Sequence, residues 1–155
     1  MSFSKRMSRI KPSGIRAVQK RIAGKSDMIS FAAGLPDPAL YPLEDLRKAA
    51  DTMLEKEGAT AFAYGLTKGY GPLLDYLTDR MNNREHVECT KENICILSGS
   101  QQGLGLAAMT FLDEGDVVIT ENPSYLGAIN AFRPYGAEFV GVDTDDDGIV
   151  IEDLE

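Results

Sequence analysis

The stretch Ile94-Cys-Ile-Leu-Ser-Gly-Ser-Gln-Gln-Gly-Leu-Gly-Leu-Ala-Ala-Met-Thr-Phe111 decides the fold expected for this chain. Its first four residues, 94–97, are apolar and partly β-branched, which predicts a short buried strand. Gly99 lets the backbone approach a ligand closely, and Ser98 or Ser100 can cap a following helix. That helix is predicted by apolar residues at helical spacing, namely Leu104, Ala107, Ala108 and Phe111.

A strand, a small-residue turn and a helix start together form an anion site. The N–H groups of the first helical turn have no partner within the helix, and the helix dipole adds positive potential there. We interpret the turn at 98–101 as a phosphate cradle. The alternative is a tight βα turn that carries glycine and serine for steric reasons alone.

Two specific phosphate motifs do not match this stretch. A P-loop ends in Gly-Lys-Ser/Thr, but Leu106 follows Gly105. A dinucleotide site requires Gly-x-Gly-x-x-Gly, whereas these glycines fall at 99, 103 and 105. Glu121 lies where the ribose-binding acid of that fingerprint would be, but the glycine spacing argues against a nicotinamide site.

Composition narrows the class of protein. With 155 residues, 43% of them apolar and 26% charged, the chain is long enough for one soluble domain with a core. A net charge of −8 argues against nucleic-acid binding, and the basic cluster from Lys5 to Lys25 is interpreted as a solvated helix face. No apolar run approaches the roughly 20 residues of a membrane span, and no signal peptide is recognisable.

The cysteines and the histidine favour neither a disulfide nor a metal centre. Cys89 and Cys95 are interpreted as reduced thiols of a cytoplasmic protein, with Cys95 inside the buried strand. Neither they nor His86, the one histidine, have metal-ligand spacing, so no metal site is expected.

The first half of the chain is predicted to be helical, with long irregular connections. A helix over 13–23 has an apolar stripe with Arg16 off it and exposed, and Gly24 ends it. An apolar run at 28–32 is followed by an irregular segment over 34–42, which holds three prolines. Two more helices are expected, over 43–57 and 72–82, with a glycine-rich loop between them.

The second half is predicted to alternate strands and helices. After the helix that ends near Phe111, a buried strand is expected over 117–120, a helix over 125–135 and a strand over 138–142. The order β-α-β-α-β from residue 94 implies parallel strands with right-handed crossovers. Ligands bind at the carboxyl ends of such strands, so Tyr125 is expected near a phosphate held at 98–101. A flat aromatic phosphate ester would use both features.

The acidic segment 143–148 imitates part of a calcium-binding loop. Asp143-Thr-Asp-Asp-Asp-Gly148 matches the first half of an EF-hand, but the twelfth position, which should be a bidentate glutamate, is Leu154. We interpret the segment as a solvated acidic turn.

Four motifs, in order and at suitable spacing, resemble one family. They are Phe31-Ala-Ala-Gly-Leu-Pro-Asp-Pro38, Tyr64-Gly65 with Gly69-Tyr-Gly-Pro-Leu73, Ser98-Gly-Ser-Gln-Gln-Gly103 and Glu121-Asn-Pro-Ser-Tyr125. Together they resemble the front half of a fold-type I, pyridoxal-phosphate-dependent aminotransferase of class I/II. Ser13-Gly-Ile-Arg16 resembles the N-terminal substrate helix of the aminoadipate/kynurenine aminotransferase subgroup.

The resemblance implies an α/β fold. It is the three-layer α-β-α, mostly parallel sheet of the large domain of pyridoxal-phosphate-dependent transferases, incomplete in this chain and preceded by a helical and irregular N-terminal segment. Residues 1–43 would form that segment, with small-domain and dimer contacts. Residues 44–155 would form the first part of the cofactor-binding large domain.

The resemblance also assigns roles to individual residues. Gly99, Ser100 and Gln101 would hold the phosphate of pyridoxal 5'-phosphate through backbone N–H and hydroxyl groups, and Tyr125 would stack on the pyridine ring. Tyr64 would reach the phosphate of the neighbouring subunit, so that a homodimer completes the site. Without the family match, both tyrosines are equally explained as half-buried aromatics.

Two further residues would face the substrates, an amino acid and a 2-oxo acid. Gly34 would meet the substrate carboxylate through its backbone, and Arg16 would contact an acidic or aromatic substrate side chain. Without the family match, Gly34 is a turn glycine and Arg16 a surface cation.

No catalytic residue is assigned within this chain. Pyridoxal phosphate chemistry needs a Schiff-base lysine, an acidic partner for the pyridine nitrogen and an arginine for the α-carboxylate. In this family all three lie beyond Glu155, and Lys68 is not in a matching context. The chain is therefore expected to be the N-terminal part of a longer enzyme and inactive alone, since three parallel strands are too few for the large domain.

Two other functions stay open, and a third is not expected. A lyase or decarboxylase of the same fold would differ in residues outside this chain. A regulator with an aminotransferase-like sensor domain would carry a DNA-binding module in front, and we expect none because only about a dozen residues precede Ser13-Gly-Ile-Arg16. A small nucleotide-binding βαβ module would bind phosphate as a stable monomer.

Overall fold

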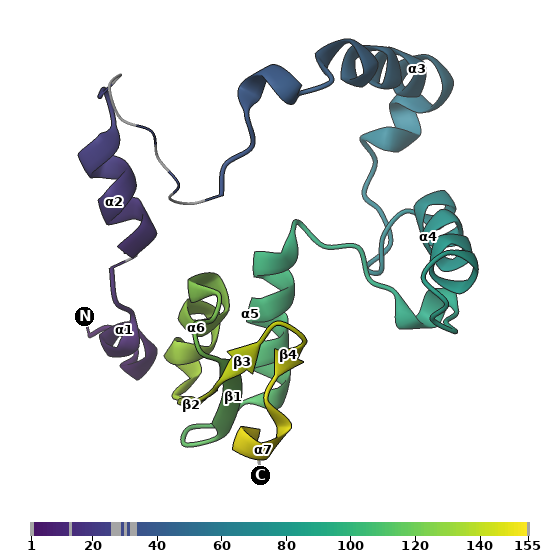
Figure 1. Cartoon of the computed structure of the whole chain (residues 1–155). Coiled ribbons are helices and arrows are strands. Elements are labelled where there is room, and N and C mark those ends of the chain that lie inside the picture. Colours follow the sequence, from purple (N-terminus) through teal and green to yellow (C-terminus); the bar gives the residue numbers. More distant parts are fainter. Residues whose placement is uncertain (1, 13, 26–28, 30, 32–33, 155) are drawn as a thin grey trace. The chain divides into compact units, whose positions relative to one another are not determined.

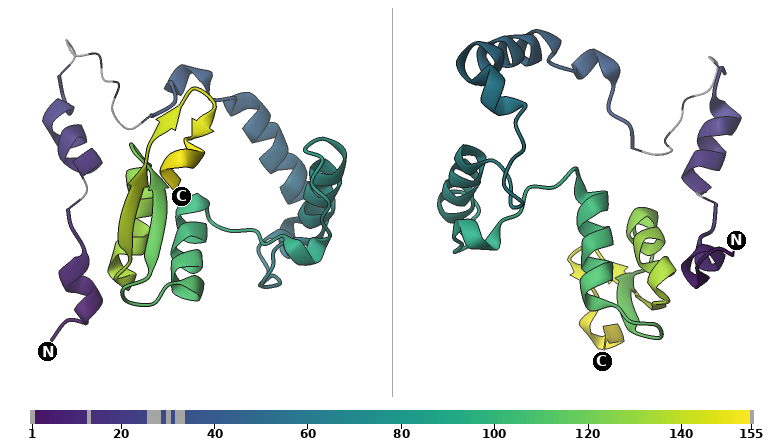
Figure 2. Two further views of the ribbon diagram at one scale, coloured as in Figure 1. Left: turned by 60° about the horizontal axis from the view of Figure 1, so that its bottom comes forward. Right: turned by 180° about the vertical axis from the view of Figure 1, so that it is seen from behind.

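The computed structural model describes residues 2–12, 14–25, 29, 31 and 34–154. The chain divides into two compact units. One unit combines Met1–Pro12 with Leu97–Glu155, and the other spans Ser13–Ile96. Figure 1 labels their helices and strands, and Figure 2 shows them from two further directions.

The unit spanning Ser13–Ile96 is helical, as predicted. Its helices are α2 (Gly14–Ile22), α3 (Leu43–Ala61) and α4 (Gly71–Asn83), with two short 3-10 turns, η1 (Pro38–Leu40) and η2 (Lys91–Asn93). The turn η1 is the one regular piece inside the proline-rich segment expected to be irregular. The apolar run expected at 28–32 lies largely outside the described residues.

The predicted starts and stops of these helices have clear local causes. Gly24 follows α2 with φ +80°, the left-handed conformation in which glycine commonly ends a helix. In α3, Glu44 and Asp45 lie in the first turn, where the helix dipole favours negative charge. Glu57, the predicted last residue, interrupts α3 with φ −136° and ψ 15°. Pro72 lies in the first turn of α4, where its missing N–H costs nothing.

The other unit contains the α/β part of the chain. Its elements are α1 (Lys5–Arg9), α5 (Ser100–Phe111), β1 (Val117–Glu121), α6 (Leu126–Phe132), η3 (Arg133–Tyr135), β2 (Glu138–Val142), β3 (Thr144–Asp145), β4 (Gly148–Ile149) and α7 (Ile151–Leu154). Strands β1 and β2 pair in parallel, with Val117 opposite Glu138 and Glu121 opposite Val142. This confirms the predicted parallel crossover. Helices α5 and α6 pack side by side.

The strand predicted at 94–97 does not form. The segment is irregular, and one backbone bond, from the Ile96 N–H to the Lys68 carbonyl (2.8 Å), ties it to the preceding loop. A strand needs a neighbour along its whole length, and β1 and β2 pair only with each other within the described part of the chain. Cys95 is consequently exposed rather than buried.

Strand β1 is also less buried than its sequence predicts. Val117 is 58% and Ile119 51% exposed, because they share one face of the strand and nothing in the described chain covers that face. Leu74, Ala108 and Val142 are the buried apolar residues among those described. Apolar sequence here therefore marks surfaces that this stretch of chain does not itself cover.

The acidic segment forms the expected turn. Strands β3 and β4 pair as an antiparallel hairpin around it. The Asp145 carboxylate accepts hydrogen bonds from the N–H groups of Asp147 (2.8 Å) and Gly148 (3.1 Å), so it is used by the turn itself.

Helix α1, which the sequence analysis did not predict, docks on η3 through two charged contacts. The Arg6 guanidinium lies 4.9 Å from the centre of the Tyr135 ring, and Arg9 pairs with Glu114. Hydrogen bonding and charge from Arg9 hold the pKa of the Glu114 carboxyl below its usual 4.5, with a smaller contribution from Lys5; burial opposes this shift.

We expect the docking of α1 to be lost in acid. Because the folded pKa of Glu114 is lowered, its contribution is present above about pH 4.5 and disappears as the pH falls through the lower folded value. Hydrogen-exchange protection of the α1 amides, measured relative to that of the β1 amides, should fall only below about pH 4.5. Glu114→Gln should remove the dependence, and an unchanged acid profile in this variant would assign it to other groups.

Candidate cofactor-binding site

The turn before α5 has a backbone conformation suited to close approach by a ligand. Gly99 is the N-cap residue, with φ +86° and ψ 166°, a region that is essentially restricted to glycine. Neither Ser98 nor Ser100 caps the helix with its side chain, contrary to the prediction. Instead the Gln102 side-chain oxygen accepts a hydrogen bond from the Ser98 N–H (2.6 Å). The side chain that orders this turn is therefore that of Gln102, not that of either serine.

Two backbone donors at this helix start are available to a ligand. The Gln102 N–H bonds to the Gly99 carbonyl (3.2 Å), but the N–H groups of Ser100 and Gln101 have no acceptor within the described residues. Both residues are exposed. Unpaired N–H groups at a helix N-terminus favour an anion such as a phosphate. The geometry therefore fits the phosphate of the cofactor that the sequence implies.

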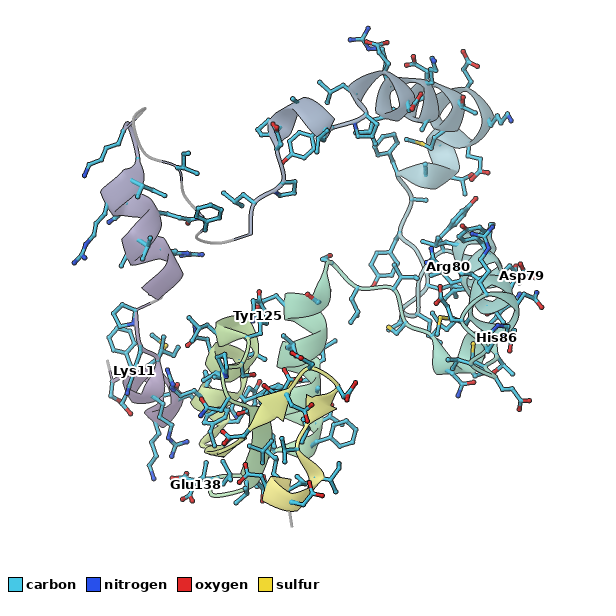
Figure 3. All side chains as sticks on the ribbon, viewed as in Figure 1. Lys11, Asp79, Arg80, His86, Tyr125 and Glu138 are labelled. Carbon is cyan, nitrogen blue, oxygen red and sulfur yellow. The ribbon has the colours of Figure 1, made fainter. Side chains whose placement is uncertain are left out.

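Tyr125 lies beside this helix start. It is the N-cap residue of α6 and its side chain is 62% exposed (Figure 3). The Gln101 side-chain N–H donates to the Gly127 carbonyl in the first turn of α6 (3.2 Å). The structure thus brings together the turn at 98–101 and the segment leading into α6, as predicted, although the strand expected at 94–97 does not form. The roles of these residues stay predictions.

The remaining predicted site residues belong to the other unit. Tyr64 is fully exposed in the loop after α3. It lines an open hollow of about 760 Å³ together with Met53, Glu57, Leu66 and Tyr70. The Tyr70 hydroxyl donates to the Glu57 carboxylate, a hydrogen bond that raises the pKa of Tyr70.

The two expected substrate contacts also lie in this unit. Gly34 is exposed with φ +55°, a conformation that glycine adopts without strain. Arg16 lies on α2 with an exposed side chain, as its position off the apolar stripe predicted.

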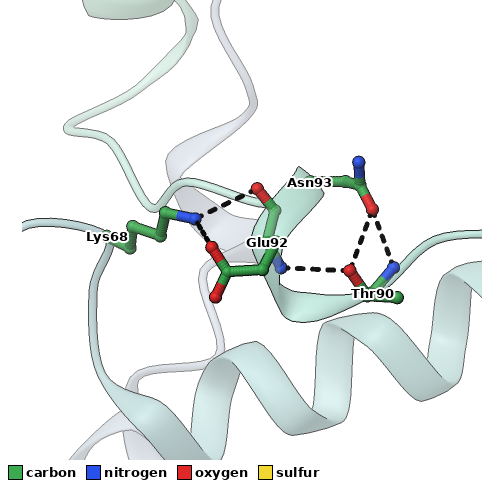
Figure 4. Close-up of polar contacts among 4 residues, drawn as sticks. All are labelled: Lys68, Thr90, Glu92 and Asn93. Carbon is green, nitrogen blue, oxygen red and sulfur yellow. Dashed lines mark hydrogen bonds and ion pairs between the residues drawn. The ribbon is translucent and has the colours of Figure 1, made fainter.

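Lys68 is occupied by a structural role. Its Nζ donates to the Glu92 carboxylate and to the Glu92 carbonyl (3.2 Å), as Figure 4 shows. The pair lowers the pKa of Glu92. Thr90 and Asn93 form a capping box that orders η2. Lys68 links this turn to the loop before α4.

The comparison with known proteins identifies the family. The family model for aminotransferase class I and II matches residues 26–155. The chain belongs to this family.

Individual aminotransferases match nearly the whole chain. An aromatic-amino-acid aminotransferase of Thermococcus litoralis is 40% identical over 99% of this chain and 36% of its own length. The solved structure of Pyrococcus horikoshii kynurenine aminotransferase, in complex with PMP, is 37% identical with a TM-score of 0.88, covering 98% of this chain and 37% of that one. Thermus thermophilus LysN, an alpha-aminoadipate aminotransferase complexed with N-(5'-phosphopyridoxyl)-L-leucine, is 39% identical with a TM-score of 0.82, covering 98% and 36%.

These matches establish the fold as that of the pyridoxal-phosphate-dependent aminotransferases. The chain spans little more than a third of the length of the aminotransferases it matches. Among the described residues, no helix is long and apolar enough to cross a membrane.

Sequence reasoning missed two residues of this candidate site. Gln102 orders the turn through its side chain, and Gly127 contacts both Gln101 and Tyr125. The spacing Tyr-x-Gly at 125–127 was the available signal, because a glycine in the first turn of a helix has no propensity reason to be there.

Proposed function

We propose that this chain supplies the phosphate-binding and ring-stacking part of a pyridoxal-phosphate-dependent aminotransferase, which exchanges amino groups between an amino acid and a 2-oxo acid. One observation carries the proposal. The free N–H groups of Ser100 and Gln101 lie on a helix start that is hydrogen-bonded to the first turn of α6, where Tyr125 presents an exposed ring.

The residues of this unit would hold the cofactor. The N–H groups of Ser100 and Gln101, with the Ser100 hydroxyl, bind the phosphate, and Gly99 keeps the approach free of a side chain. Tyr125 stacks on the pyridine ring and keeps water from that face. When bound, pyridoxal phosphate acts as an electron sink for the substrate amino acid.

The other unit would contribute the substrate and subunit contacts. Gly34 meets the substrate carboxylate through its backbone N–H, and Arg16 contacts an acidic or aromatic side chain. Tyr64, fully exposed in its loop, reaches the phosphate held by a second copy of the chain, so the functional protein is a homodimer. A subunit contact of this kind would bury an aromatic ring that is otherwise fully exposed to water.

Two further assignments are part of the proposal. We place the protein in the cytoplasm, because Cys89 and Cys95 are free thiols. We also propose that residues 1–43 form an N-terminal segment and residues 44–155 the first part of the large domain.

The chemistry requires groups that we assign to sequence beyond residue 155. They are the lysine that binds the cofactor, the acid at the pyridine nitrogen and the arginine for the α-carboxylate. The match to only about a third of each aminotransferase supports this assignment.

One experiment tests the proposal directly. The natural gene product is purified with pyridoxal phosphate, treated with borohydride to trap the cofactor on a lysine, and measured by intact and peptide mass. We expect a mass well above 16.9 kDa, with one pyridoxyl group on a lysine outside residues 1–155. A mass near 16.9 kDa without an adduct would contradict the proposal, and nucleotide binding without an adduct would favour the small βαβ module.

A further inference from the structure

We propose that Gly127 is a positioning residue that seats the Tyr125 ring for cofactor stacking. The inference rests on the proposed function, in which Tyr125 stacks on pyridoxal phosphate, and assigns a role to a residue outside the phosphate cradle.

The Tyr125 ring occupies the space that a side chain at position 127 would fill. A Cβ added to Gly127 would lie 2.4 Å from both Cε1 and Cζ of Tyr125 and 2.6 Å from its hydroxyl oxygen. Non-bonded carbons rest about 3.5–4.0 Å apart. The ring therefore lies directly over the bare backbone of the first turn of α6, while 62% of Tyr125 stays exposed for a ligand.

A second contact links the same glycine to the phosphate cradle. The Gly127 carbonyl accepts a hydrogen bond from the side-chain N–H of Gln101 (3.2 Å). The backbone N–H of the same Gln101 is one of the two free donors. Gly127 thus lies against the Tyr125 ring and is hydrogen-bonded to Gln101 of the cradle. Its position sets how far the ring lies from the phosphate donors.

The glycine is not explained by the helix itself. Alanine is the better helix former at such a position, and another helical glycine of this unit, Gly105, has open space around an added Cβ. At position 127 the three atoms nearest to an added Cβ all belong to Tyr125. We therefore expect Gly127→Ala to keep α6 and to push the Tyr125 ring out of its seat.

The test compares pyridoxal phosphate affinity and Tyr125 nitration in the full-length protein. Four variants are needed: Gly127→Ala, Tyr125→Ala, the double variant, and Gly105→Ala as the matched helix control. We expect Gly127→Ala to weaken cofactor binding about two- to tenfold, the worth of one aromatic stack, and to raise nitration of Tyr125 in the cofactor-free protein. Gly105→Ala should change neither.

The double variant separates positioning from general damage. If Gly127 acts through the ring, adding Gly127→Ala to Tyr125→Ala should have no further effect on affinity. An equal loss in both backgrounds, or unchanged affinity and nitration in Gly127→Ala, would overturn the inference. Failure of the wild-type protein to bind pyridoxal phosphate would instead overturn the proposed function, and this role with it.

Discussion

Gly99→Ala is expected to weaken pyridoxal phosphate binding by about 5- to 150-fold. Gly99 has φ +86° and ψ 166°, where a residue with a Cβ is strained by about 1–3 kcal/mol. Relief of that strain rotates the peptide that leads into α5, and this turns the N–H groups of Ser100 and Gln101 away from the phosphate. The fold-change is this strain expressed as an affinity ratio.

Cofactor titration of the full-length protein, followed by absorbance, measures this effect. Gly105→Ala is the matched control, because it lies in the same helix and an added Cβ meets nothing within 4 Å. Equal affinities of wild type and Gly99→Ala would show that the turn before α5 does not hold the phosphate.

Gly69→Ala is expected to destabilise the fold by about 2–6 kcal/mol. Gly69 has φ +121°, and a Cβ there would lie 2.4 Å from Cγ1 and 2.6 Å from Cβ of Ile96. The strained backbone and the overlap each cost about 1–3 kcal/mol. Lys68, the preceding residue, bonds to both Glu92 and the Ile96 N–H, so the loop has little freedom to move away.

Denaturant unfolding of the full-length protein checks this value. Gly65→Ala, in the same loop and with open space around the new Cβ, should change the free energy of unfolding by less than about 0.5 kcal/mol. Combining Gly69→Ala with Ile96→Ala should recover only the part of the overlap that is due to Cγ1, because the Cβ of residue 96 remains 2.6 Å from the added Cβ. A loss of the same size in Gly65→Ala would assign the effect to the loop in general and not to the contact with Ile96.

Local sequence signals predicted α2, α3 and α4, but not α1. The start of α3 at Leu43, its interruption at Glu57 and the place of Pro72 in α4 depend on neighbours within one or two turns of helix. The same holds for Gly24 after α2. Such features are determined by backbone conformation and capping, and these act over a few residues.

The strands were predicted less well, because burial depends on what lies across the sheet. The segment 94–97 has the composition of a buried strand but no ladder partner in the described chain. Val117 and Ile119 were expected to be buried and are half exposed or more. An apolar pattern indicates that a surface becomes buried, but the element that buries it can be far away in the sequence.

The sequence by itself determined the family, the parallel crossover from β1 to β2, and the turn at 98–101 as the phosphate site to be tested. Each of these follows from short motifs and from the order in which they occur. Only the tertiary structure decided the contacts of Gly127 with Gln101 and of Gly69 with Ile96. Gly127 and Gln101, like Gly69 and Ile96, are separated by more than twenty residues. Local propensity does not encode such contacts, which exist only once the chain has packed.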